Sequence, residues 1–92
     1  MKEIKSWSII CINNPYRAPE LTCYYVFGTY KGKLIRTSYI VEIQNDVIIT
    51  YSGSQYKLVG KPEILPISDK MRFADLDEVS ESILAKLSME KL

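Results

Sequence analysis

Residues 24–60 read YYVFGTYKGKLIRTSYIVEIQNDVIITYSGSQYKLVG. Runs of β-branched and aromatic residues are interrupted there by short polar or glycine-containing segments at 31–32, 44–46 and 52–53. Such runs, separated by tight turns, are typical of successive antiparallel strands. The stretch therefore predicts strands over 21–30, 33–43, 47–51 and 54–59.

The residues before this stretch predict one more strand and a loop. Residues 4–12, IKSWSIICI, are rich in isoleucine and contain no glycine or proline, which favours a strand. Residues 13–20, NNPYRAPE, hold two prolines and two asparagines and are predicted to form a loop. The following strand is apolar on both faces, so it should be central, and Gly28 within it indicates a bulge or a close backbone approach.

The residues after it predict a connector and a helix. Pro62 and Pro66 favour an extended connector over 61–72. A helix is expected over about 75–90, capped by Asp75 with Glu78 as the reciprocal partner. Its apolar side chains recur at helical spacing, and they are Leu76, Val79, Ile83 and Leu87, with Leu84 beside them. This stripe either covers the open face of the sheet or pairs with a second subunit.

These elements predict an α+β fold in one domain spanning residues 1–92. The expected architecture is a five-stranded antiparallel meander, curved or closed into a partly open barrel, with one C-terminal helix. A chain of 92 residues buries only a modest core. A homo-oligomer is therefore predicted, because association would bury more apolar surface.

Charge is unevenly distributed along the chain. The net charge is +1, but residues 1–61 hold eight Lys/Arg against four Asp/Glu, whereas residues 62–92 hold four against seven. The strand region is thus the expected place for an anionic partner. The near-neutral total counts against a nucleic-acid binder without excluding a local basic patch. Because no apolar run is long enough to span a membrane and no signal peptide is recognisable, the prediction is a cytoplasmic protein without membrane association.

Catalytic and metal-binding patterns are missing from the sequence. There is no histidine, so neither a serine nor a cysteine triad can form, and Cys11 and Cys23 alone cannot make the usual zinc site. Both cysteines lie in apolar runs and are interpreted as buried thiols, with a disulfide between neighbouring strands as the alternative. No phosphate-binding glycine motif occurs, and no spacing brings two carboxylates together. The sequence predicts no enzyme, no metal and no cofactor.

Two polar clusters in the strand region suggest a ligand site. If 33–43 and 47–51 form a hairpin about Asn45, residues 36–38 lie across from residues 52–54. Arginine recognises phosphate or carboxylate with its planar fork, and hydroxyls beside a glycine also suit an anion. The candidate ligand-binding residues are Arg36, Thr37, Ser38, Ser52, Ser54 and Tyr56, with Tyr16 and Arg17 at the rim. The alternative is ordinary strand and turn chemistry.

Tyrosine is frequent, with seven residues in the chain. Packing within the core and across strands explains most of them. An exposed subset beside Lys31, Lys33, Arg36 and Lys57 would form a stacking platform for bases. The same subset would equally suit a protein interface, where tyrosine and arginine are favoured anchors.

A sequence pattern within the strand region adds a resemblance. Residues 28–40 follow G-x-x-x-G-x-x-I-R-T-S-x-I, and residues 49–60 follow I-T-Y-S-G-S-x-Y-x-L-V-G. Together they resemble a motif of small phage and prophage accessory proteins. The resemblance covers about a third of the chain and includes no catalytic signature. It implies a viral accessory protein that binds and blocks a host component, as small oligomeric β-domains that sequester nucleotide signals do.

The sequence thus predicts a non-catalytic binding protein, with a counter-defence role in the host cytoplasm if it is phage-encoded. Its expected partner is a small anionic ligand such as a nucleotide. One alternative is a protein-interaction module that inhibits a host defence protein or a nuclease. Another is a single-strand nucleic-acid binder.

Overall fold

Seven strands and one helix make up the described part of the chain. The computed structural model describes residues 1–12, 23–69 and 71–90, without the side chains of Cys23 and of residues 86–90. The predicted loop over 13–20 lies outside the described residues. In chain order the elements are β1 (Lys2–Ile12), β2 (Cys23–Tyr30), β3 (Lys33–Arg36), β4 (Ile40–Gln44), β5 (Val47–Thr50), β6 (Gln55–Leu58), β7 (Met71–Ala74) and α1 (Leu76–Glu90).

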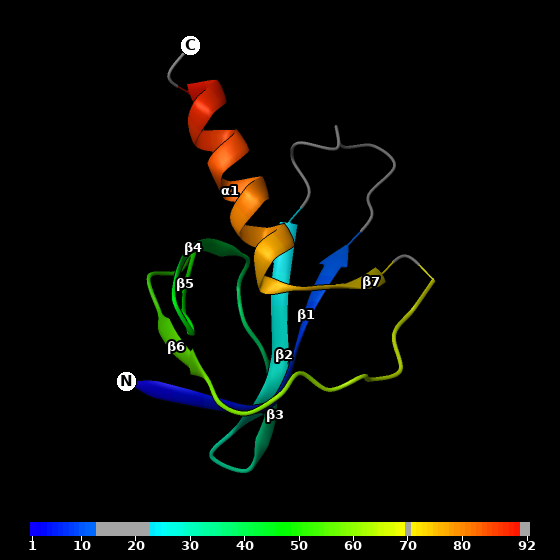
Figure 1. Cartoon of the computed structure of the whole chain (residues 1–92). Helices are drawn as coiled ribbons and strands as arrows, with labels where there is room; N and C mark the ends of the chain where they lie inside the picture. Colours follow the sequence, from blue (N-terminus) through cyan, green and yellow to red (C-terminus); the bar gives the residue numbers. More distant parts are fainter. Residues whose placement is uncertain (13–22, 70, 91–92) are drawn as a thin grey trace.

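The strands form one mixed sheet organised around a bent first strand. The hydrogen-bonded order is β3-β2-β1-β6-β5-β4, and β7 also pairs with β1 (Figure 1). Residues 2–4 of β1 run parallel to β6, whereas residues 9–12 lie between antiparallel β2 and β7. The bend falls at Ser6, whose φ is +50°, beside an irregularity between Lys5 and Ser8. The predicted α+β class is confirmed, but the predicted all-antiparallel meander is wrong because β1 pairs with β6 in parallel.

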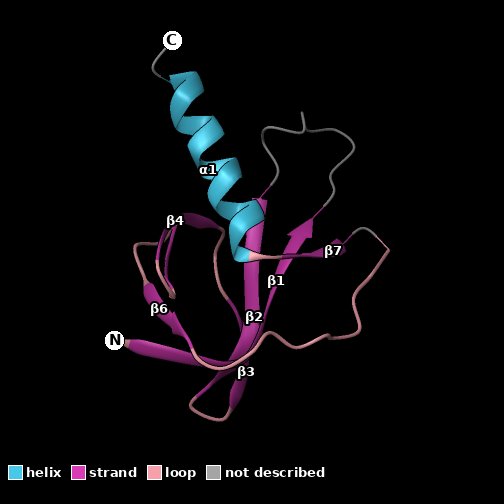
Figure 2. Ribbon diagram, viewed as in Figure 1, coloured by secondary structure: helices cyan, strands magenta, loops and turns pink. Residues whose placement is uncertain are grey.

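The predicted strand over 33–43 is two strands that lie at opposite ends of the sheet. β3 pairs with β2, and β4 pairs with β5. The residues between them contact both neighbours, since Thr37 N donates to Val26 O and Tyr51 N donates to Tyr39 O. β3 and β4 do not pair with each other, so the sheet is open (Figure 2) and the predicted partly open barrel is wrong.

The seventh strand was missed in the predicted connector over 61–72. β7 begins at Met71 and pairs antiparallel with β1, with Ile10 opposite Phe73. Beyond its bend, β1 no longer pairs with β6. The backbone N–H and C=O groups along that edge of β1 therefore need other hydrogen-bond partners. β7 supplies those partners, which is expected because buried backbone N–H and C=O groups are almost always hydrogen-bonded.

A bulge in β4 sets which side chains reach the core. The β4–β5 register is Gln44↔Val47 and Ile43↔Ile48, then shifts between Ile40 and Glu42. Strict alternation along the predicted strand over 33–43 would place Val41 on the same face as Ile43, but the shift leaves Val41 40% exposed and buries Ile40 to 5% exposure. The hydrophobic pattern alone did not reveal the extra residue.

Gly28 marks the close backbone approach that its position predicted. A β-carbon at this glycine would overlap Ile4 Cγ2 and lie 3.0 Å from Lys5 O and 3.2 Å from Trp7 Cα. β2 therefore crosses the bend of β1 with no side chain between the two backbones. Trp7, beside this crossing, is held by two hydrogen bonds: its Nε1 donates to Gly60 O at 3.1 Å, and its carbonyl accepts from Glu63 N.

The helix packs by its first turns on the sheet of its own chain. Val79 is fully buried in the main cluster with strand residues such as Ile9 and Ile48, and Leu76 and Ile83 pack against that cluster. Figure 1 shows α1 starting over the sheet and continuing beyond it. Further along the predicted stripe, Leu84 is 63% exposed, and the Leu87 side chain lies outside the described part. No helix in the described ranges is both long and apolar enough to cross a membrane.

Of the two contacts predicted for the helix cap, the structure shows one. The Asp75 Oδ1 accepts from Glu78 N at 2.7 Å, which confirms Asp75 as the cap. The Glu78 side chain pairs with Arg72 of β7 instead of reaching back to Asp75. This hydrogen bond raises the pKa of the Arg72 guanidinium above its already high usual range, so the pair ties the helix start to β7 in its charged form.

Tyr24 is expected to make the fold sensitive to alkali. Burial of its phenol, followed by the nearby Glu78 carboxylate, raises the pKa of Tyr24 above 10.0. Stability from the neutral phenol is thus complete below pH 10.0 and falls as the pH rises through that value towards the folded-state pKa. We expect urea unfolding between pH 9 and 11 to show a shallower loss for Tyr24→Phe than for the unmodified protein. Tyr51→Phe, which alters an exposed tyrosine, is the control, and an equal slope in all three proteins would contradict the prediction.

Candidate functional site

The hydroxyls of the two predicted polar clusters meet across the β4–β5 hairpin. Ser38 Oγ donates to Ser52 Oγ at 3.1 Å, and Ser52 Oγ lies 3.5 Å from Ser54 Oγ. Thr50 adds a fourth hydroxyl, 3.1 Å from Ser52 Oγ. The predicted neighbourhood of Ser38 with Ser52 and Ser54 is therefore present. The predicted pairing, symmetric about Asn45, holds only beyond the bulge in β4, because the bulge shifts the register of β4 and β5 by one residue.

These hydroxyls and the backbone around Gly53 are already hydrogen-bonded within the turn. Ser52 N donates to Ser38 Oγ at 3.3 Å, Gly53 N donates to Thr50 O at 2.8 Å, and Thr50 Oγ1 donates to Ser54 O at 3.3 Å. Gly53 has φ +86°, which explains the glycine at this place. The cluster closes the turn after β5, and these two backbone N–H groups are not presented to an anion.

Thr37 and Arg36 stand apart from the serine cluster. Thr37 is 4% exposed, and its hydroxyl accepts from Val26 N at 3.1 Å and donates to Ser38 O at 2.8 Å. The Thr37 hydroxyl thus accepts a hydrogen bond from β2 that a neighbouring strand would otherwise accept, at the point where the chain passes from β3 to β4. The Arg36 guanidinium is exposed and lies 5.7 Å from the centre of the Tyr25 ring. Among the described residues, Arg36 makes no hydrogen bond with the serine hydroxyls.

Tyr56 lies beside a different group of charges. Its half-buried ring packs against the main cluster, and the Lys2 ammonium stands 5.4 Å from the ring centre. Tyr16 and Arg17, the predicted rim, lie outside the described residues. Among the predicted site residues that the structure describes, Tyr56 is thus the one that contacts a lysine of the cleft described next.

A cleft of about 790 Å³ opens between the N-terminal end of β1, the start of β6 and the β2–β3 turn. We call it the lysine cleft. Its wall is formed by Met1, Lys2, Glu3, Lys5, Thr29, Tyr30, Lys31, Gly32 and Gln55. Three lysines against one glutamate give it a net positive lining. An anionic ligand would therefore be attracted to it.

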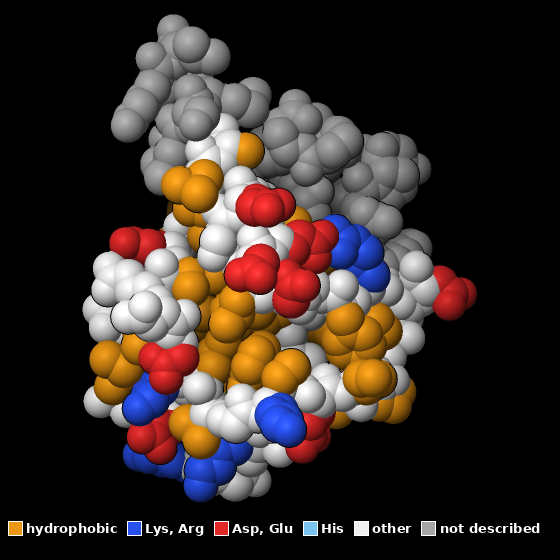
Figure 3. Space-filling model, in the orientation of Figure 1, with side chains coloured by type: hydrophobic (Ala, Val, Ile, Leu, Met, Phe, Trp, Pro, Cys, Tyr) orange, Lys and Arg blue, Asp and Glu red, His pale blue; other side chains and the backbone are white. Residues whose placement is uncertain are grey.

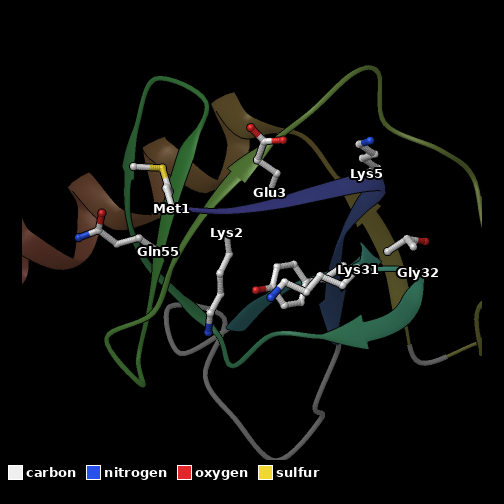
Figure 4. A pocket seen from close by; sticks show the side chains of 9 residues that line it. Met1, Lys2, Glu3, Lys5, Lys31, Gly32 and Gln55 are labelled. Atoms are coloured by element: carbon white, nitrogen blue, oxygen red, sulfur yellow. The ribbon is translucent and has the colours of Figure 1, made fainter.

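Two of the lysines face the same side of β1. Figure 4 shows the side chains of Lys2 and Lys31 on one side of the strand and those of Glu3 and Lys5 on the other. Each of the first pair is held over a ring, Lys2 over Tyr56 and Lys31 over Tyr30, with 5.4 Å from Nζ to the ring centre in both cases. The Glu3 carboxylate points away from this pair, so it does not neutralise it (Figure 4).

On the face of the molecule that Figure 3 shows, the charged side chains of the described residues are arranged to favour the same end. Asp77 and Glu78 lie in the first turn of α1, and Figure 3 shows acidic side chains gathered there. Most basic side chains visible in Figure 3 lie towards the opposite end, with a few acidic ones among them. The unequal charge of the two sequence halves was the one signal of this arrangement. The lysines themselves come from separate segments, and only the fold brings them together.

A stacked aromatic pair with one exposed ring lies on the β4–β5 side. Tyr39 and Tyr51 stack with ring centres 4.7 Å apart and planes inclined by 24°. Tyr51 is 69% exposed, so one of its faces is open to solvent. The pair stands next in sequence to Ser38 and Ser52, whose hydroxyls are joined.

The described ranges 1–12, 23–69 and 71–90 contain no cluster of three or more histidine, cysteine, aspartate or glutamate residues suited to a metal ion. Comparison with protein-family models, with curated proteins and with solved structures found no match. The chemistry of the site is accordingly argued from its own side chains.

Proposed function

We propose that this protein is a non-catalytic binding protein that holds a small polyanion, such as a nucleotide, in the lysine cleft. The observation that carries the proposal is the Lys2–Lys31 pair, which directs two ammonium groups to one side of β1 with no carboxylate between them. The cleft volume of about 790 Å³ suits a ligand of nucleotide size. Lysine binds phosphate as a point charge, which suits a protein that holds its ligand without reacting with it.

The proposed geometry assigns a role to each wall of the cleft. Lys2 and Lys31 contact phosphate oxygens, and their tyrosines keep the ammonium groups in place. Gln55 offers an amide that donates and accepts hydrogen bonds, which suits a base or a sugar. The serine cluster stabilises the turn that precedes Gln55, and Thr37 has no part in the site, because its hydroxyl is buried and fully used.

The test is calorimetric titration with ATP and with tripolyphosphate, using adenosine as the ligand without phosphate. The variant Lys2→Gln/Lys31→Gln should bind both polyanions roughly 30-fold more weakly, which corresponds to about 1 kcal/mol for each lysine. Lys57→Gln, which removes an exposed lysine outside the cleft, is the matched control and should lose less than about threefold. Adenosine should bind weakly and equally to all three proteins.

Two results would refute the proposed site. Equal losses in Lys57→Gln and in the cleft variant would mean that net charge alone attracts the anion. Absence of binding by either polyanion would remove the ligand-binding function and leave a macromolecular partner as the remaining role.

A protein-interaction role is the second candidate, and the stacked Tyr39–Tyr51 pair favours it. Tyrosines with an open face are common anchors of interfaces, and Tyr51 is 69% exposed. In this case the protein would mask a host defence protein or a nuclease. If the ring stacks on single-stranded nucleic acid instead, affinity would fall steeply with added salt.

The biological context of the proposed function is inferred from the sequence resemblance to phage accessory proteins. The proposal includes action in the cytoplasm, a counter-defence role and a homo-oligomeric state. Association of copies would bury some of the exposed apolar side chains, such as Leu34, Ile64 or Leu84. Light scattering of the purified protein gives the oligomeric state directly.

A further inference from the structure

The strand β3 stands at one end of the sheet, so one of its two edges has no strand beside it (Figure 1). Thr37 N donates to Val26 O, and in the antiparallel register of β2 and β3 every second residue before Thr37 also bonds to β2. The N–H and C=O groups of the residues between, Leu34 and Arg36, therefore point to the open edge. Among the described residues, no other backbone group hydrogen-bonds to them.

The side chains of β3 place one cation and one apolar group on each face of the strand. Lys33, Leu34 and Arg36 are exposed, Leu34 to 72%, whereas Ile35 is half-buried against the main cluster. Lys33 and Ile35 share one face, and Leu34 and Arg36 share the other. Along the strand, the order is thus basic, apolar, apolar, basic.

The cations of this edge have no acidic neighbour in their own hairpin. Residues 23–41 contain Lys31, Lys33 and Arg36 but neither aspartate nor glutamate. No described carboxylate forms an ion pair with Lys33 or Arg36, and the Arg36 guanidinium lies 5.7 Å from the centre of the Tyr25 ring. Basic side chains on a short edge strand repel most strands that approach it. They select a strand that brings carboxylates to them.

We propose that β3 binds an extended segment of another protein, which adds to the open edge as a further strand and has the pattern acidic-apolar-apolar-acidic. The backbone of the segment hydrogen-bonds to Leu34 and Arg36. Its two carboxylates lie across from Lys33 and Arg36, and its two apolar side chains lie across from Leu34 and Ile35. This site is independent of the lysine cleft and of the function proposed there.

Two other occupants match this edge less well. A nucleic-acid strand offers phosphate oxygens, which accept from the N–H groups of Leu34 and Arg36 but leave their carbonyl groups without a donor. A second copy that paired through the same strand would bring basic side chains beside basic ones. Residues 1–92 contain no segment with the pattern acidic-apolar-apolar-acidic, which favours a different protein as the partner.

The test is an NMR titration of the full-length ¹⁵N-labelled protein with the capped peptide Thr-Glu-Val-Val-Glu-Thr. The matched control is Thr-Val-Glu-Glu-Val-Thr, which has the same composition and charge. The first peptide should bind about tenfold more tightly, because it alone forms two cross-strand pairs of opposite charge. It should also slow hydrogen exchange at the amides of Leu34 and Arg36, while Ile35, which already donates to β2, changes little.

A reversal of charge tests the two cations directly. Lys33→Glu/Arg36→Glu should weaken the first peptide by about tenfold or more, and it should bind Thr-Lys-Val-Val-Lys-Thr instead. Lys57→Glu/Lys61→Glu changes the net charge equally at two exposed lysines outside β3 and is the control. It should weaken the first peptide less than about threefold.

Five results would overturn the proposal. Equal binding of the first peptide and its control would mean that net charge alone attracts them, and shifts at Lys2 and Gln55 in place of 33–36 would put the peptide in the lysine cleft. Slow exchange of Leu34 and Arg36 in the protein alone would show that a second copy occupies the edge. Equally tight binding of oligothymidylate at 33–36 would assign the edge to nucleic acid. The fifth is the absence of any shift with millimolar peptide.

Discussion

Gly28→Ala is expected to lower the free energy of unfolding by roughly 3 kcal/mol or more. The new methyl group would overlap Ile4 Cγ2 and press on Lys5 O and Trp7 Cα, two backbone atoms on the bend of β1. Ile4 cannot turn away, because it is fully buried in the main cluster. The strands must separate at the crossing, which disrupts the pairing of β1 with β2. Urea unfolding followed by circular dichroism measures the loss.

Gly32→Ala is the matched control for this change. Gly32 lies in the β2–β3 turn, where a β-carbon would meet nothing within 4 Å, but its φ of +77° strains an alanine. Its expected cost is about 1 kcal/mol from the backbone alone. If Gly28→Ala cost no more than Gly32→Ala, the close crossing of β1 and β2 would be refuted.

Val79→Asp is expected to unfold the protein at neutral pH. Val79 is fully buried, and an ionised carboxylate there has no described cation in its cluster of apolar side chains. Burying such a charge costs more than about 4 kcal/mol, whereas a domain of this size has about 5–10 kcal/mol of stability in total. Far-UV circular dichroism and Trp7 fluorescence at pH 7 would report the loss of the fold.

Ala85→Asp places the same residue on the exposed side of the same helix and controls for helix propensity. It should cost about 0.5 kcal/mol. Lowering the pH to about 4 should return part of the structure of Val79→Asp relative to this control, because a neutral carboxyl is less costly to bury. Equal stability of the two variants at pH 7 would show that α1 does not rest on the sheet.

Local patterns in the sequence predicted the elements well where each strand contacts its neighbours in the chain. The hairpins about 31–32 and 45–46 and the cap at Asp75 all depend on residues within a few positions of one another. The break between β3 and β4 is different. Residues 33–43 alternate without interruption, and the break follows from the contacts of Thr37 with β2 and of Tyr39 with β5.

Long-range pairing explains the other errors in the fold. The parallel contact of β1 with β6 joins Ile4 to Leu58, and no local pattern indicates it. β7 is only four residues long and follows a segment with two prolines, so its sequence did not suggest a strand. It forms because the bend at Ser6 leaves β1 with an edge to be paired.

The candidate sites show the same limit. Ser38, Ser52 and Ser54 were correctly expected to meet, since a hairpin register relates them. The lysine cleft was not expected, because Lys2 and Lys31 meet through the topology alone.

The parallel contact between β1 and β6 also sets the order in which the molecule can assemble. During synthesis, residues 2–4 leave the ribosome well before residues 56–58, their partners, have been made. The chain between them can form its hairpins at once, but the first residues of β1 must wait. Such distant pairing raises the contact order, and high contact order slows folding into the millisecond-to-second range. A nascent chain that stops before β6 would therefore carry an unpaired strand end, open to aggregation or to a chaperone.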